Sequence, residues 1–391
     1  MHFLAADPLF DEGLSMAVVL IVILKTVVTF AVLMVAVLFM VWYERKLISD
    51  MQNRIGPARA GGRFGVLQSL ADGIKLFFKE DLLPERADKR VYRLAPYLSA
   101  VPAFLSFAIV PVGGAVTLWG HETTLQLADP PVGILFLLAM SGISVYGVML
   151  AGWSSGSKYP LLGSVRASAQ MVSYEAALGL SIATVVLVAG SLSTRVIALD
   201  QGGAGPGGFL PDWNIVRLGV VPFVIFMIAA TAELNRPPFD LVEAEQELVG
   251  GFHTEYSSIR FALFFLAEFM NTVTMSAIIV TLFLGGPSGP LLGVLPDWLW
   301  PIIWFVAKLM VFLSVYIWFR ATLPRLRYDQ LMDLGWKLLI PLSLFWLLVI
   351  AAVRIEGWYV FVGVGVGIAV AALLSRAMAV GRARVGEKVG Q

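Results

Sequence analysis

The sequence predicts an all-α, polytopic membrane protein. Hydrophobic residues make up 58% of its 391 residues and charged residues only 14%, whereas soluble domains carry about 25% charged residues. The mean hydropathy is +0.82. Several apolar runs also reach the roughly 20 residues that a helix needs to cross a bilayer. Together these observations exclude a soluble globular domain.

Eight apolar runs form the expected core of membrane-spanning helices, and a ninth follows them. The core spans are 16–42, 97–119, 131–152, 170–192, 215–234, 258–284, 299–320 and 336–353. The ninth, 357–375, is rich in glycine. We therefore divide the chain into a membrane domain, 1–353, and a C-terminal extension, 354–391, with a basic tail.

The basic residues lie mainly in alternate loops, which predicts the orientation. Of the 28 Lys and Arg residues, 23 lie in the loops 43–96, 153–175, 233–260 and 320–337 and in the tail. Arg195, Arg217 and Arg354 lie in the loops between them. Because basic loops stay cytoplasmic, we expect the N-terminus outside and the C-terminus in the cytoplasm. The acidic start does not resemble a signal peptide, so the first span is expected to be retained.

The composition also limits the chemistry of this chain. The sequence has no cysteine, which excludes disulfides, iron–sulfur ligation and thiolate zinc sites. Its three histidines, His2, His121 and His253, are far apart in the sequence, so we expect no metal site. The net charge of +1 gives no indication of nucleic-acid binding.

The first cytoplasmic loop contains an expected amphipathic helix in "GVLQSLADGIKLFFKEDLLP". Apolar residues recur with helical spacing from Leu67 to Phe78, and Asp72, Lys75 and Lys79 share another face. The segment is too polar to span the membrane and is predicted to lie on its surface. It either anchors the chain or forms the wall of an opening for a lipid-like substrate.

Ionisable residues also occur at or within the predicted spans. Glu175 lies where the fourth apolar run begins, Glu268 lies about ten residues into the sixth span, and Lys25 and Lys308 lie in the first and seventh. A charged group costs about 2.5–3.5 kcal/mol at the centre of a membrane helix. We therefore interpret these residues as candidates for a polar path, with a solvated carboxylate as the alternative for Glu175 and snorkelling as the alternative for Lys25.

The most unusual segment is "ELNRPPFDLVEAEQELVGGF", which follows the fifth span. Its carboxylates are Glu233, Asp240, Glu243, Glu245 and Glu247, and Glu255 follows them. Pro237 and Pro238 end the fifth helix. If a helix resumes after them, Asp240, Glu243 and Glu247 share one face, and like charges there titrate as a coupled set. The alternative is a solvated loop.

The fourth cytoplasmic loop, "FRATLPRLRYDQLMDLGWK", is rich in arginine. We expect Arg327 to anchor the loop at the membrane surface. Arg320 and Arg325 are candidates to neutralise the acidic stretch across the cytoplasmic face.

These segments resemble the signature motifs of one family. "YERKLISDMQNRIGP", "ADGIKLFFKED", "VSYEAALGL", "ELNRPPFDLVEAEQELVGGFHTEYSS" and "FRATLPRLRYDQLM" are similar to the H subunit of bacterial respiratory complex I, the family of mitochondrial NADH dehydrogenase subunit 1. The resemblance runs from about residue 16 to residue 353. The family has eight core spans, so the extension 354–391 departs from its pattern and has no assigned role.

The resemblance implies a multi-pass protein of the bacterial plasma (inner) membrane and a function in proton-translocating NADH:quinone oxidoreduction. NADH, FMN and iron–sulfur clusters would belong to partner subunits, namely the quinone-site subunits of the peripheral arm, with small membrane subunits as further neighbours. Quinone, either ubiquinone or menaquinone, would be the substrate, lipid would surround the chain, and this chain would bind no cofactor alone.

The resemblance also implies roles for individual residues. The proton path would comprise Glu175, Glu233, Asp240, Glu243, Glu245, Glu247, Glu255, Glu268 and Lys308. The quinone tunnel and acidic funnel would be shaped by Glu44, Arg45, Asp72, Lys75, Phe77, Arg236, Phe239, Arg320 and Arg325. No residue would be catalytic in the bond-breaking sense.

Three other functions fit parts of the pattern. A homologous membrane subunit of a hydrogenase or ferredoxin-linked complex would carry similar motifs. A free-standing transporter would need internal symmetry and broken helices, and the sequence has neither. A purely structural anchor would tolerate neutralisation of its buried acids.

Overall fold

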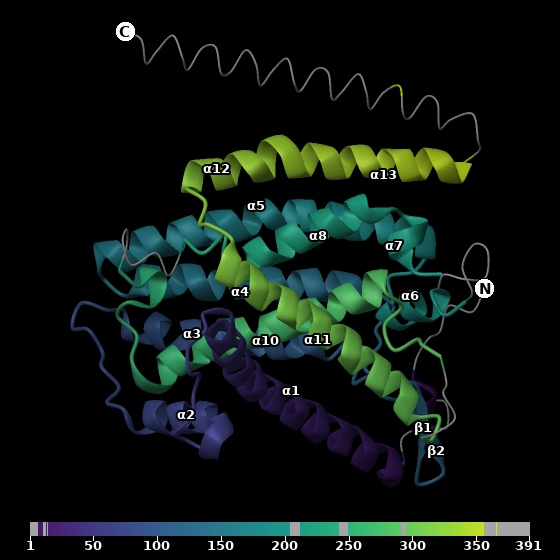
Figure 1. Cartoon of the computed structure of the whole chain (residues 1–391), viewed down its shortest axis with the longest axis horizontal. Coiled ribbons are helices and arrows are strands. Elements are labelled where there is room, and N and C mark those ends of the chain that lie inside the picture. Colours follow the sequence, from purple (N-terminus) through teal and green to yellow (C-terminus); the bar gives the residue numbers. More distant parts are fainter. Residues whose placement is uncertain are drawn as a thin grey trace.

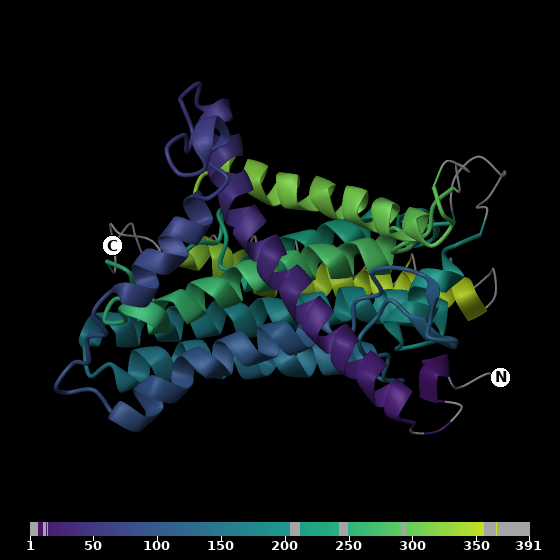
Figure 2. The same cartoon turned by 90° about the horizontal axis from the view of Figure 1, so that it is seen from below.

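The computed structural model describes residues 7–10, 13, 15–203, 212–241, 249–290, 295–355 and 365. Most of its long helices lie side by side along the long axis of the molecule, and α1 (Met16–Met51) crosses them obliquely (Figure 1, Figure 2). Six helical segments of the described chain are long and apolar enough to cross a membrane. The chain is therefore a multi-pass helical membrane protein.

The remaining elements follow in chain order. The α-helices are α2 (Gln68–Phe78), α3 (Lys89–Phe107), α4 (Gly133–Ser154), α5 (Lys158–Ala189), α6 (Thr194–Asp200), α7 (Asn214–Arg217), α8 (Val220–Glu233), α10 (Ser258–Phe283), α11 (Leu299–Thr322), α12 (Tyr328–Asp333) and α13 (Ile340–Ile355). The short helical turns are η1 (Pro8–Phe10), η2 (Gly62–Phe64), η3 (Gly251–His253) and the π-helical η4 (Leu334–Leu339), which joins α12 to α13.

The centre of the bundle is formed by α5, α8 and α10, while α1 and α13 lie at opposite edges (Figure 1). In an apolar 18-residue stretch of α10, 72% is buried, whereas only 17% of the corresponding stretch of α1 is buried. Small residues allow close helix contacts, as is usual in membranes. A Cβ at Gly147 of α4 would collide with Ser99 of α3, and one at Gly152 would collide with Ser164 of α5.

The predicted span 97–119 is wrong in its position. The helix there is α3, which begins at Lys89 and ends at Phe107, and a β-hairpin follows it. Strand β1 (Ala115–Leu118) pairs antiparallel with β2 (His121–Thr124). Trp119 and Gly120 have φ values of 50° and 85°, which is the backbone of a tight hairpin turn. The all-α prediction therefore needs this one correction within the described chain.

The predicted loop 153–175 is also largely wrong, because α5 begins at Lys158 and not near residue 170. Its first turns are rich in small residues that let it approach other backbone closely. A Cβ at Gly163 would lie 2.7 Å from the Cα of Gly251. Glu175 is consequently in the middle of a long helix and not at its beginning.

Two other predicted spans differ from the observed helices. The span 215–234 is divided into α7 and the short α8, with Gly219 between them at a φ of 77°. The span 336–353 is part of a longer helical run, 328–355, that includes η4. The ninth span, 357–375, falls outside the described residues apart from residue 365.

Lys25, in the N-terminal half of α1, forms an ion pair with Asp7. Its Nζ lies 2.5 Å from Asp7 and donates to the Thr123 hydroxyl at 3.0 Å. Thr123 in turn donates to Asp7. This cluster joins η1, α1 and β2, so it accounts for a charged residue in an apolar span.

Candidate functional site

The site is built around the turn that follows α8. Helix α8 ends at Glu233, and Asn235 takes a positive φ of 50° before a cis peptide bond between Pro237 and Pro238. The Arg236 N–H donates to the Thr231 carbonyl at 3.3 Å. The chain therefore reverses sharply at the end of α8 and directs Arg236 and Asp240 back toward the bundle.

Gln170 of α5 holds this turn in place. Its Nε2 donates to the carbonyls of Ala232 at 2.7 Å and Phe239 at 2.9 Å, and to Asn235 Oδ1 at 3.2 Å. Gln170 is fully buried. Because unpaired buried carbonyls are costly, one side chain satisfies the backbone on both sides of the proline pair.

Three helices meet at an ion network beside the turn, centred on the buried side chains of Glu44 and Arg236. Arg236 Nη1 lies 3.1 Å from Glu44 Oε2, and Arg320 of α11 pairs with the other oxygen of Glu44. Arg236 Nε lies 2.9 Å from Glu268 of α10, and its guanidinium lies 4.4 Å from the centre of the Phe269 ring. The network joins α1, the turn, α10 and α11.

Asp240 forms a second pair at the same turn. Its Oδ2 lies 3.1 Å from Arg325 Nη2, and Asp240 is only 2% exposed. The Leu326 N–H also donates to the Pro238 carbonyl at 3.0 Å. Of the two arginines expected to neutralise the acidic stretch, Arg325 therefore pairs with an acid of that stretch, whereas Arg320 pairs with Glu44 of α1.

The paired charges balance. Glu44, Glu268 and Asp240 are opposed by Arg236, Arg320 and Arg325. Glu44, Arg236 and Asp240 are buried, and pairing offsets the cost of burying their charges.

A cavity of about 60 Å³ lies beside this network. Glu233 of α8, Asp240 of the turn and Glu268 of α10 all line it. Other polar lining residues are Ser99, Ser144, Asn235, His253 and Asn271. A cavity needs roughly 10–15 Å³ for one water molecule, so this one has room for a few. Three carboxylates therefore face one space that water can fill.

Glu233 also lies on a second, smaller cavity of about 20 Å³. One of its carboxylate oxygens accepts a hydrogen bond from Ser141 of α4. Within the described chain, the other oxygen, Oε2, has no hydrogen-bond partner. Glu233 is 7% exposed, so this unpaired oxygen suits a bridging water.

Two further residues extend from Glu233 into the bundle. The carboxylate of Glu175 lies against Gly142, where a Cβ would be 3.6 Å from Oε1. Ser141, which donates to Glu233, directly precedes Gly142, so Glu175 and Glu233 contact the same part of α4. Tyr316 of α11 is buried, and its hydroxyl has no hydrogen-bond partner among the described residues.

Two residues predicted for the same path lie elsewhere. Lys308 Nζ donates to the carbonyls of Leu284, Gly286 and Ser288, at the far end of α10 from Glu268. Glu255 is absent from the lining of the cavity, and its backbone carbonyl accepts from the Tyr92 hydroxyl at 2.7 Å. Neither residue lines the cavity with the described carboxylates Glu233, Asp240 and Glu268.

Three predicted acids, Glu243, Glu245 and Glu247, lie outside the described residues. The expectation that Glu243 and Glu247 share a helical face with Asp240 therefore stays a prediction.

The residues predicted for the tunnel fall into two groups. Arg45 pairs with Asp72 at 2.5 Å and so ties α1 to the amphipathic α2, on which Lys75 and Phe77 are exposed. Phe239, in contrast, is 4% exposed and packs with its ring centre 5.4 Å from that of Tyr174.

The amphipathic helix α2 is held at its C-terminal end by α10. Ser258 Oγ donates to the carbonyls of Leu76 at 3.1 Å and Lys79 at 2.8 Å. Arg260 pairs with Asp81 at 2.9 Å. The exposed apolar face of α2 is therefore fixed relative to the ion network.

Sequence reasoning missed Ser141, Ser144, Tyr316 and His253 as residues of the site. Ser141 and Ser144 are three residues apart in the apolar "LAMSGISVYG", and polar residues inside a span are functional candidates. The sequence therefore contained a signal for Ser141 and Ser144. Tyr316 and His253 had no comparable signal. Within the described chain, no group of three or more His, Asp or Glu side chains is placed to hold a metal.

Comparisons with known proteins support one family. The sequence model of NADH dehydrogenase matches residues 24–351. A protein of Frankia casuarinae, named as the H subunit of NADH-quinone oxidoreductase, is 53% identical over 359 residues, which are 91% of this chain and 75% of that protein.

Two further proteins with the same name are similar to a comparable degree. The one from Frankia alni is 55% identical over 86% of this chain and 73% of its own length. The one from Streptomyces avermitilis is 51% identical over 85% of this chain and 73% of its own length.

Proposed function

The chain belongs to the NADH dehydrogenase family, and on that premise we propose that it couples quinone reduction to proton transfer within an NADH-quinone oxidoreductase. Its partners would be the other subunits of that complex, which would carry NADH, FMN and the iron–sulfur clusters. The chain would lie in the bacterial plasma membrane with its N-terminus outside and its C-terminus in the cytoplasm.

The observation that carries the proposal is the cavity shared by Glu233, Asp240 and Glu268. Carboxylates that face one water-filled space can exchange protons through the water. Because they are close together, their titrations are coupled. A change of charge at one edge of the cavity would therefore shift protons at the others.

The arginines set the resting charge of this site. Arg236 pairs with Glu44 and Glu268, and Arg325 pairs with Asp240. Glu233 has a hydroxyl partner, Ser141, in place of an arginine. Since it lacks a cationic partner among the described residues, Glu233 is the carboxylate whose proton would be most easily moved.

Quinone would approach from the end of the bundle that carries the turn. The exposed apolar face of α2, with Phe77, and the Arg45–Asp72 pair would flank its route. The acids Glu243, Glu245 and Glu247, together with Asp240, would form the funnel beneath it. Glu233 and Glu175 would carry the proton path inward, with Ser141 and Tyr316 beside it.

The association with partners is tested by isolating the tagged chain from its native membrane in mild detergent. We expect the eluate to contain flavin and to oxidise NADH with a short-chain quinone. A chain that elutes with a hydrogen-evolving partner, or alone, would contradict the proposal.

The role of the acids is tested with charge-neutral variants of the assembled complex. Glu268→Gln and Glu247→Gln should lower NADH–quinone turnover by about tenfold or more. Glu122→Gln, which removes an exposed carboxylate from β2, is the matched control and should leave turnover unchanged. Full turnover in both test variants, with normal assembly, would overturn the assignment.

A further inference from the structure

A second charged pocket lies at the opposite end of the bundle from the carboxylate cavity. It has a volume of about 570 Å³ and is lined by Val188, Asp200, Arg217, Ile350, Val353 and Arg354. Val188 is in the last turn of α5, and the other apolar lining residues are near the end of α13. The pocket therefore opens where two candidate spans reach the membrane boundary.

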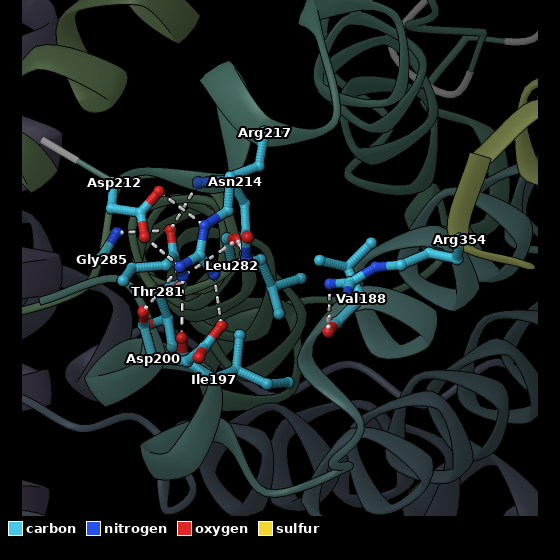
Figure 3. Close-up of polar contacts among 11 residues, drawn as sticks. Val188, Ile197, Asp200, Asp212, Asn214, Arg217, Thr281, Leu282, Gly285 and Arg354 are labelled. Carbon is cyan, nitrogen blue, oxygen red and sulfur yellow. Dashed lines mark hydrogen bonds and ion pairs between the residues drawn. The ribbon is translucent and has the colours of Figure 1, made fainter. Parts of the chain in front are cut away.

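One wall of the pocket is held together by ion pairs around Arg217. Arg217 Nη1 lies 2.5 Å from Asp200, Arg217 Nε donates to Asp212 Oδ1 at 2.7 Å, and Nη2 pairs with the other oxygen of Asp212 (Figure 3). Gln201, the residue after Asp200, donates from Nε2 to the Ile197 and Thr281 carbonyls at 3.0 Å. These bonds fix the positions of Asp200 and Arg217 without a ligand.

The facing wall offers a cation from α13. Arg354 Nη2 donates to the Val188 carbonyl at 3.0 Å, away from the Arg217 cluster (Figure 3). A guanidinium has five N–H donors, and this bond uses one. Arg354 is exposed, so its remaining donors can bind a phosphate, which a guanidinium recognises with two parallel bonds.

The pocket also offers an anion. The Asp200 side chain is 40% exposed although it pairs with Arg217. Arg217 pairs with both Asp200 and Asp212, so this group has two negative charges and one positive charge. A ligand that places a phosphate on Arg354 would therefore be favoured further if it also placed a cation near Asp200.

We propose that this pocket binds the headgroup of a phospholipid that carries both a phosphate and a primary ammonium group, as in phosphatidylethanolamine. The phosphate binds Arg354, the ammonium binds Asp200, and Val188, Ile350 and Val353 contact the apolar part of the lipid. Free phosphate would leave this apolar wall uncovered. An anionic lipid without an amine would bring its charge near Asp200 with no compensating bond.

The proposal gives α13 a lipid-mediated contact with the bundle. In an apolar 18-residue stretch of the helical run 328–354, only 11% is buried. A headgroup held between Arg354 and Asp200 would link the end of α13 to α6 through the lipid.

The experiment uses the assembled complex, isolated through the tagged chain in mild detergent and depleted of lipid. Binding of dioleoyl phosphatidylethanolamine, dioleoyl phosphatidylglycerol and inorganic phosphate is measured separately by native mass spectrometry. We expect the amine lipid to bind most tightly. Arg354→Gln should raise its apparent Kd about tenfold, and Arg354→Lys should recover part of the affinity.

The matched control is Arg195→Gln, which removes a charge from α6 outside the pocket and should leave the Kd unchanged. Asp200→Asn should abolish the preference for the amine lipid over the glycerol lipid. Equal Kd values for the wild type and Arg354→Gln would overturn the site. Equal binding of the two lipids by the wild type would overturn the role of Asp200, and phosphate binding as strong as lipid binding would overturn the lipid assignment.

Discussion

Glu44 of α1 and Arg236 of the turn after α8 form a buried ion pair between residues 192 positions apart in the sequence. Both side chains are less than a tenth exposed. The pair joins the helix at the edge of the bundle to the turn that carries the acidic stretch. Because the two residues are so far apart in the sequence, their contact depends on the tertiary fold.

The Glu44–Arg236 pair should be energetically coupled. Removing one partner of a buried ion pair costs about 3–5 kcal/mol, because the other charge is left uncompensated. Glu44→Gln and Arg236→Gln should each lower the thermal stability of the assembled complex. The double variant should lose less than the two losses combined, as measured by tryptophan fluorescence on heating. Additive losses would show that the two side chains do not interact.

Gln170 should be needed for turnover because it positions the turn. Gln170→Leu would leave three acceptors without their donor, at a cost of about 1–3 kcal/mol for each buried group that stays unpaired. We expect the variant to lose stability and to lower NADH–quinone turnover of the complexes that assemble. Turnover is measured per assembled complex, from the flavin content.

Gln201→Leu is the matched control for Gln170→Leu. Gln201 is equally buried and also donates to backbone carbonyls, but at the other end of the bundle. It should lose comparable stability with normal turnover per assembled complex. If both variants lower turnover equally, the turn has no special role.

Lys308 should contribute to stability and not to proton transfer. Its ammonium satisfies three carbonyls after the end of α10. Lys308→Met should therefore lower the melting temperature, and Lys308→Arg should recover part of it. Turnover per assembled complex should stay normal in both variants. A selective loss of turnover in Lys308→Met would return this residue to the proton path.

Asp212 should make stability depend on pH in acid. The hydrogen bond from Arg217 lowers the pKa of the Asp212 carboxyl. A carboxyl with a lowered pKa stabilises the fold above its ordinary pKa, and the contribution disappears as pH falls through the lowered value. Asp212→Asn should therefore melt earlier than the wild type near neutral pH, and the difference should vanish in strong acid. A difference that is constant with pH would contradict this account.

Much of the architecture could be predicted from the sequence because apolar runs of sufficient length have few alternatives. The long α1, α4, α10 and α11 are close to the predicted spans. The hairpin was missed because its strands have four residues each and a tryptophan occupies the first turn position. The early start of α5 was missed because this part of the helix is rich in Ser, Gly and Ala. These residues pack against other backbone without forming a long apolar run, so the hydropathy of the sequence does not indicate the helix there.

The site was predictable in composition but not in geometry. The sequence indicates that acids follow α8 and that arginines lie in another loop, and Arg325 does pair with Asp240. It does not indicate that Ser141 bonds Glu233 from 92 residues away. Such contacts depend on the packing of helices against one another. Lys308 is a further example. Its position in an apolar span suggested a role in a polar path, but its ammonium donates to backbone carbonyls that follow the end of α10.

The most direct test of the central claim is the rate of proton translocation by the complex with Glu233→Gln. The complex is reconstituted into proteoliposomes, supplied with NADH and quinone, and compared with the wild type and with Glu122→Gln at equal flavin content. We expect a rate about tenfold or more below the wild type in Glu233→Gln, with Glu122→Gln unchanged. A wild-type rate of proton translocation in Glu233→Gln would contradict a proton path through the shared cavity.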